Sequence, residues 1–210
     1  MCFSPEVSLA TFLIGTIGAA FAYSLGTVTD HIIAVFLGYV ALMQGIEWIL
    51  WNHQTCDSFH KQVSLAGMIL NLSQPIVFGL LILMFNTRPR YKLPIIAIMI
   101  SSIVYSINYV VQYKDDLQCT TPRPNDPHLV WNWTVMDSYQ HMWFLYIAVF
   151  VAIAMLGMPT LQSSLLVSIS MIFGMITSIL VYPRQDMGAM WCFFAAFTPF
   201  IYYIYNKLGL

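Results

Sequence analysis

Charged side chains are scarce in this chain: Asp, Glu, Lys and Arg together make up 8% of its 210 residues. Soluble domains carry about 25% charged residues, so these few charges cannot cover a surface that faces water. Hydrophobic residues reach 59%, and the mean hydropathy is +0.73. The composition excludes a soluble globular domain, a disordered chain and a nucleic-acid-binding protein. It indicates a multi-pass integral membrane protein.

Lys and Arg are absent from the long apolar stretches, and Glu47 is the only acidic residue within them. A bilayer span needs about 20 apolar residues. We therefore predict an all-α fold in which residues 1–210 form a single integral membrane domain and the first stretch is retained as a helix. The predicted seven-transmembrane-helix bundle has spans at about 7–26, 31–51, 64–85, 93–112, 139–157, 161–182 and 188–206.

Familiar cofactor and catalytic motifs are also missing. A retinal pigment needs a lysine in mid-membrane, and the four lysines all lie in loops or at the last helix end, so retinal is excluded. The sequence has no HExxH, Walker, GxSxG or TVGYG-like motif. A non-enzymatic role is therefore favoured, although catalysis stays open.

The loop after the third predicted span holds the densest positive charge, with Arg88, Arg90 and Lys92. Because Lys and Arg in short loops favour the cytoplasmic side, this loop is expected inside the cell. An odd number of spans then places the N-terminus outside and the C-terminus in the cytoplasm.

Two features of the predicted outer loops agree with this orientation. Asn132 begins an Asn-Trp-Thr glycosylation sequon. Cys56 and Cys119 also lie in outer loops, where a disulfide could persist. A Cys56–Cys119 bond and two free thiols are both open at this point.

A shift along the chain that places Pro75 on Pro199 aligns the first three predicted spans with the last three, with each proline at a similar depth in its helix. A three-helix unit repeated around one linker helix gives the 3+1+3 layout of some small transporters. Pro75 also removes a backbone donor and frees the carbonyl near position 71. That carbonyl could bind a cation or a ligand hydroxyl, while a simple kink and prolines without any repeat are the plainer alternatives.

Polar side chains gather in the predicted outer half of the second and third spans. Gln44 and Glu47 share one helix face, and Asn71 and Gln74 share another. An intramembrane carboxyl is costly unless it is protonated, paired or wetted, so it indicates function by default. We expect a solute- or ion-binding cluster in which Glu47 is protonated or hydrogen-bonded rather than ion-paired. The alternative is that Glu47 reaches the interface and the amides join helix to helix.

Cys2, His141 and Cys192 are predicted at similar depth near the outer surface. Thiolate and imidazole can ligate zinc, copper or iron, so a membrane metal or redox enzyme is an alternative function. No CxxC or HxxxH spacing supports it, and a packed cysteine with an interfacial histidine is the plainer interpretation.

Several short motifs resemble a family of small membrane proteins of bacteria and large DNA viruses that begin MC[FW]S. They are Met1-Cys2-Phe3-Ser4, Leu37-Gly38-Tyr39-Val40-Ala41-Leu42-Met43-Gln44, Cys56, Gln74-Pro75, His141-Met142-Trp143 and Trp191-Cys192-Phe193. The resemblance implies about seven helices and no established activity. Many members carry His where this chain has Asn71, and an acid near Gln44, which disfavours a metal or proton role for the cluster here.

Taken together, these features predict a channel- or transporter-like protein for an ion or small solute, embedded in a cell or viral membrane. Its expected partners are the lipid bilayer and that solute, and a homo-oligomer is left open. A structural protein of a viral envelope is a third alternative.

Overall fold

The computed structural model describes residues 4–85, 87–114, 119–123, 126–131, 139–181 and 187–208. The prediction of an all-α fold with seven helices is confirmed for this part of the chain. The helices are α1 (Pro5–Tyr23), α2 (Val28–Asn52), α3 (Ser58–Phe85), α4 (Lys92–Tyr113), α5 (Tyr139–Gly157), α6 (Leu161–Val181) and α7 (Met187–Leu208), with a 3-10 turn η1 (Pro89–Tyr91) before α4.

Two helices begin earlier than predicted, because polar residues cap them. At α2, Thr27 and Asp30 form a capping box, in which each side chain accepts a hydrogen bond from the other residue's backbone N–H. At α3, the carboxylate of Asp57 accepts the backbone N–H of His60 at 2.9 Å. The third helix therefore starts at Ser58 and not near residue 64.

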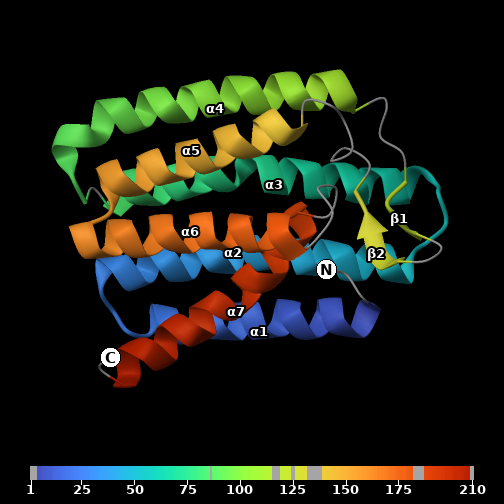
Figure 1. The fold of residues 1–210 in the computed structure, drawn as a ribbon, viewed down its shortest axis with the longest axis horizontal. Coiled ribbons are helices and arrows are strands. Elements are labelled where there is room, and N and C mark those ends of the chain that lie inside the picture. Colours follow the sequence, from blue (N-terminus) through green and yellow to red (C-terminus); the bar gives the residue numbers. More distant parts are fainter. Residues whose placement is uncertain are drawn as a thin grey trace.

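The helices lie side by side along one long axis, and α7 crosses the others obliquely (Figure 1). Helices α2 and α3 are central: α2 packs against α1, α3 and α7, whereas α3 packs against α2, α4 and α5. Helix α1 begins at the end of the bundle that carries the two strands, and α7 finishes at the other (Figure 1). We call these the hairpin end and the opposite end.

A two-stranded hairpin lies where the sequence predicts only a long loop. Strand β1 (Thr121–Arg123) pairs antiparallel with β2 (Asp126–Val130), with Thr121 opposite Val130. Leu129 in β2 and Trp131 just after the strand are 1% and 2% exposed, and both belong to the same hydrophobic core as the helices. The hairpin is therefore packed onto the bundle.

Among the residues that the structure describes, four segments are long and apolar enough to cross a membrane: α1, α2, α3 and residues 89–113. Shorter apolar segments lie within α5 and α6, at Trp143–Gly157 and Leu161–Gly174. Large apolar side chains such as Met84 and Leu180 are 78% and 79% exposed on the outside of the bundle. An apolar exterior of this kind suits lipid rather than water, and it indicates an integral multi-pass membrane protein.

Glycines allow α1 to approach its neighbours closely. A Cβ at Gly15 would lie 2.7 Å from the Cβ of Ala41 on α2 and 3.3 Å from the backbone oxygen of Ala196 on α7. A Cβ at Gly18 would lie 2.9 Å from the backbone nitrogen of Phe200. Three helices therefore meet at this glycine face.

The two prolines compared in the predicted repeat do not lie at matching depths. Helix α3 begins at Ser58 and α7 at Met187, so Pro75 lies more than one helical turn further from the start of its helix than Pro199 does. The expectation of equal depth is wrong because the cap of α3 extends that helix toward the hairpin end.

Candidate functional site: a buried polar cluster

The structure buries all four residues proposed to bind a solute. Gln44, Glu47 and Gln74 are 0% exposed, and Asn71 is 1% exposed. The first two lie on α2 and the others on α3, the two central helices. We call these four residues the polar cluster.

Close packing at Gly67 sets the register between α2 and α3. A Cβ at Gly67 would lie 3.4 Å from Cγ2 of Ile46, so these two positions face each other across the antiparallel pair. Asn71, one turn further along α3, is then near the level of Gln44. At a rise of 1.5 Å per residue, Asn71 lies about 20 Å from the start of α3 at Ser58. The polar cluster is therefore deeper in the bundle than the sequence predicts.

Three further helices contribute to the polar cluster. Thr11 of α1 donates a hydrogen bond to Oε1 of Gln44 at 2.8 Å. The hydroxyl of Tyr146 on α5 donates to Oε1 of Gln74. Cys192 of α7 is fully buried and lies within interaction range of both Gln74 and Glu47. Helices α1, α2, α3, α5 and α7 therefore converge here.

Sequence reasoning did not find Thr11 or Tyr146. Their partners lie 33 and 72 residues away in the chain. No local spacing could have indicated either contact, because each depends on how distant helices pack.

The amide groups of the polar cluster keep unused hydrogen-bonding capacity. Among the residues that the structure describes, Nε2 of Gln44 and both polar side-chain atoms of Asn71 have no hydrogen-bond partner, and Nε2 of Gln74 has only the thiol of Cys192, a weak acceptor, within range. A buried polar group without a partner costs about 1–3 kcal/mol. Whichever way each glutamine amide is turned, a described hydroxyl contacts one of its two polar atoms, so the cluster can offer hydrogen bonds to a small polar species.

A small cavity lies next to the polar cluster, between α3, α4 and α5. Its volume is about 30 Å³, and Pro75, Tyr146, Ser102 and Ser106 are among its lining residues. A cavity of roughly 10–15 Å³ already holds a water molecule. The hydroxyl of Ser106 also lies 3.4 Å from the backbone oxygen of Leu72, close to the interruption at Pro75. Solute binding at the carbonyl of residue 71 stays a prediction.

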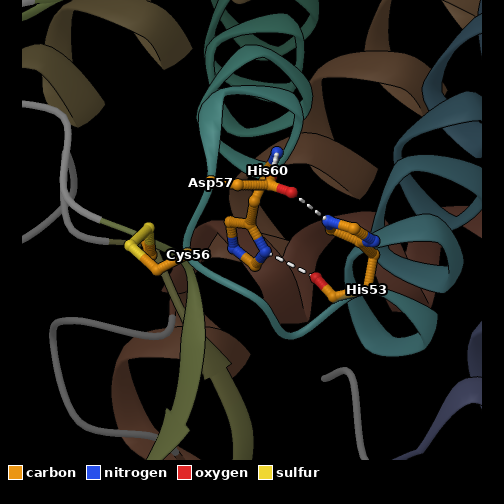
Figure 2. Close-up of polar contacts among 5 residues, drawn as sticks. His53, Cys56, Asp57 and His60 are labelled. Atoms are coloured by element: carbon orange, nitrogen blue, oxygen red, sulfur yellow. Dashed lines mark hydrogen bonds and ion pairs between the residues drawn. A yellow bond between two sulfur atoms is a disulfide. The ribbon is translucent and has the colours of Figure 1, made fainter.

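A second group of polar residues lies at the hairpin end, between α2 and α3 (Figure 2). The disulfide Cys56–Cys119 joins the turn before α3 to the segment before β1, with the two Cα atoms 5.7 Å apart. Asp57 contacts the ring of His53 at 2.9 Å, besides accepting the backbone N–H of His60. The backbone N–H of His60, followed by the His53 ring, lowers the pKa of Asp57 below its ordinary value.

His60 links this turn to the hairpin. It is 0% exposed, with Nδ1 at 2.6 Å from the backbone oxygen of His53 and Nε2 at 3.0 Å from that of Thr120. Its ring nitrogens thus contact the C-terminal end of α2 and the strand segment.

A buried acid was missed at the opposite end. Asp30 is 3% exposed and accepts the hydroxyl of Tyr202 on α7 at 2.6 Å. The predicted second span began at residue 31 and so left Asp30 in a loop. The Thr27-x-x-Asp30 pattern could have indicated it, because this spacing is typical of a helix N-terminus.

The metal prediction is only partly covered by the structure. Cys192 is buried in α7, whereas Cys2, the side chain of His141 and the sequon at Asn132 lie outside the described residues. Within the described part, no group of three His, Cys, Asp or Glu side chains is close enough to hold a metal ion.

Comparisons with protein-family models, with curated proteins and with solved structures find no match to this chain.

Proposed function

We propose that this protein crosses the membrane seven times and binds a small polar solute or ion at the polar cluster, as a step in transport. One observation carries this proposal: five helices converge on fully buried amides whose hydrogen-bonding capacity the described residues do not use. A polar solute or ion with its hydration water would supply the missing hydrogen bonds. Glu47 in the same cluster favours a cation or a solute that donates hydrogen bonds.

The position of the polar cluster supports transport. The described residues lie mostly in the helices that converge on it, so the cluster is enclosed within the bundle. The cavity lined by Pro75 and Tyr146 has space for at least one water molecule, and Tyr146, which donates to Gln74, joins it to the polar cluster. The resemblance to the MC[FW]S family adds no activity and stays a prediction.

The test is flux into liposomes that contain the purified protein, for protons, monovalent cations and small neutral solutes. Asn71→Leu and Gln74→Leu each remove a buried hydrogen-bonding group, so we expect flux to fall about tenfold, which corresponds to about 1.4 kcal/mol of lost interaction. Ser73→Ala is the matched control, because Ser73 lies on α3 between these residues but bonds Tyr39 at 2.7 Å instead.

Two results would contradict the proposal. Absence of flux for every solute would argue against transport, and flux unchanged in both Leu variants would argue against the polar cluster as its site. A stoichiometric metal that is lost in Cys192→Ser would instead favour the metal or redox enzyme, since the Cys192 thiol lies close to Glu47 and Gln74.

A further inference from the structure

One buried face of α3 runs from the hairpin end into the polar cluster. It carries His60, Ser64, Gly67, Asn71 and Gln74, which alternate in steps of four and three positions and are all buried. This spacing keeps the five positions on one side of a helix. Asn71 and Gln74 belong to the polar cluster. Whatever covers His60, Ser64 and Gly67 therefore controls access to the cluster from the hairpin end.

The hairpin covers these three positions. The backbone oxygen of Thr120 lies 3.0 Å from Nε2 of His60, and its Oγ1 lies 2.9 Å from Oγ of Ser64. The ring of Trp131 occupies the space at Gly67, where a Cβ would lie 2.5 Å from its carbons Cζ3 and Cη2. Any larger residue at 67 would displace this ring.

Trp131 lies at the outer edge of the polar cluster. Gly67 faces Ile46, the neighbour of Glu47 on α2, and precedes Asn71 by one turn on α3. Trp131 and Thr120 are 2% and 1% exposed, so both are packed tightly between the hairpin and the helices. The indole therefore fills the space between α2 and α3 near the level of Glu47, one helical turn before Asn71.

A covalent bond holds this segment in place. Cys119 precedes Thr120 directly, and its disulfide to Cys56 fixes it to the turn before α3. His60, in the first turn of α3, adds its contact with the Thr120 backbone oxygen. Figure 2 shows His60 beside Cys56 of the disulfide. The cover is thus attached at its start and packed at its end.

We propose that residues 119–123 and 126–131 form a cover that closes the polar cluster to aqueous solutes at the hairpin end, with Trp131 as the closing side chain. The Cys56–Cys119 bond and His60 hold the cover closed. This inference rests on the proposed function in one respect, because it takes the polar cluster as the site to which access matters.

Cys192 provides a native reporter of that access. The chain has four cysteines, so with Cys56 and Cys119 bonded and Cys2 replaced by Ser, Cys192 is the remaining free thiol. It is fully buried and lies near Glu47 and Gln74. Buried thiols react slowly, so the rate of its modification by a small, charged methanethiosulfonate reagent added to the purified protein measures how far the cluster is open to water.

In the Cys2→Ser background, we expect Trp131→Ala to raise the rate of Cys192 modification about tenfold or more, equivalent to about 1.4 kcal/mol in the free energy of exposing the thiol. Cys56→Ser with Cys119→Ser should also raise the rate. Trp48→Ala is the matched control, since Trp48 lies on α2 and is 39% exposed, whereas Trp131 is 2% exposed. The Cys192 rate of this variant should match the background.

Size-exclusion profiles and melting temperatures in the same detergent identify variants that fail to fold. If Trp131→Ala fails, the disulfide variant and Trp131→Phe, which leaves a smaller ring, decide the question. Rates that stay within twofold of the background in every folded variant would overturn the proposal. A raised Cys192 rate in a protein without any flux would retain the cover and reject the transport function. Flux together with unchanged Cys192 rates would retain the transport function and reject the cover.

Discussion

Glu47 occupies a costly position, because it is fully buried in a helix that is long and apolar enough to cross a membrane. Glu47→Gln keeps the size and hydrogen-bonding capacity of the side chain and should leave the fold intact. Glu47→Ala removes both and should lower the free energy of unfolding by about 1–3 kcal/mol. Thermal unfolding of both variants in detergent, over a range of pH, measures the difference.

The exposed Glu6 on α1 provides the control for that comparison. Glu6→Gln should change the melting temperature much less than Glu47→Ala does, because the Glu6 side chain is exposed. If Glu47→Gln destabilises as much as Glu47→Ala, the carboxylate is charged and paired, and hydrogen bonding alone does not explain its burial.

Asp57 gives a stability effect that depends on pH. Its pKa in the folded state lies below the ordinary 3.8, mainly because it accepts the backbone N–H of His60 and also contacts His53. A lowered pKa stabilises the fold at pH values above the unfolded pKa, and the stabilisation disappears as the pH falls through the folded pKa. Asp57→Asn should therefore melt at a lower temperature at neutral pH, and the difference between the two melting temperatures should shrink as the pH falls below 3.8 and vanish below the folded pKa. A constant difference at all pH values would show that the charge of Asp57 contributes nothing.

At the scale of elements, two glycines test how closely α1 packs against α2. Gly15→Ala places a Cβ 2.7 Å from that of Ala41, so α1 must move and the free energy of unfolding should fall by about 1–3 kcal/mol. Gly45→Ala is the matched control, because its Cβ would lie at an ordinary 3.4 Å from Phe12. Alanine is the better helix former by up to about 1 kcal/mol, so this variant should be neutral or more stable. Equal losses in chemical denaturation of the two would contradict the packing seen at Gly15.

The helices could be predicted because their signals are local. An apolar stretch such as 139–157 is bounded by polar residues, and its predicted limits match α5. The faces that carry Gln44 with Glu47 and Asn71 with Gln74 also follow from spacing alone.

The contacts of the site could not be predicted, because they join distant parts of the chain. Trp131 packs at Gly67 although the whole of α4 lies between them in the sequence. The residues before Trp131 form only the short strand β2 and give no signal of this contact. The contact of Tyr146 with Gln74 spans 72 residues. Such pairs depend on how the helices are arranged, which periodicity does not determine.

At the scale of the whole molecule, helix neighbours agree only in part with the predicted 3+1+3 repeat. Exchange of α1, α2 and α3 with α5, α6 and α7 turns the pairs α1–α2, α2–α3 and α1–α7 into α5–α6, α6–α7 and α3–α5, and all six pairs are in contact. The contact of α2 with α7 would become one of α6 with α3, and that pair is not among the main helix contacts of the described residues. The linker α4 packs only on α3 and α5 among its main contacts, so it covers one side of this arrangement.

The two ends of the bundle differ in the density of positive charge and in chemistry, and this difference predicts its orientation. At the opposite end, Arg88, Arg90 and Lys92 lie close together around η1, and Lys207 lies in the last turn of α7. At the hairpin end, Lys61, Lys114 and Arg123 are spread over three separate segments. The disulfide lies at the hairpin end. Because cytoplasmic loops are rich in Lys and Arg and disulfides persist in oxidising compartments, the hairpin end should face outward.

Tags at the N- and C-termini should then be cut from opposite sides of sealed vesicles, the N-terminal one from outside. In microsomes, Asn132 should gain a glycan that Thr134→Ala abolishes. Cleavage of both tags from the same side would refute seven spans, and an N-terminal tag cut only from the cytoplasmic face would reverse the orientation.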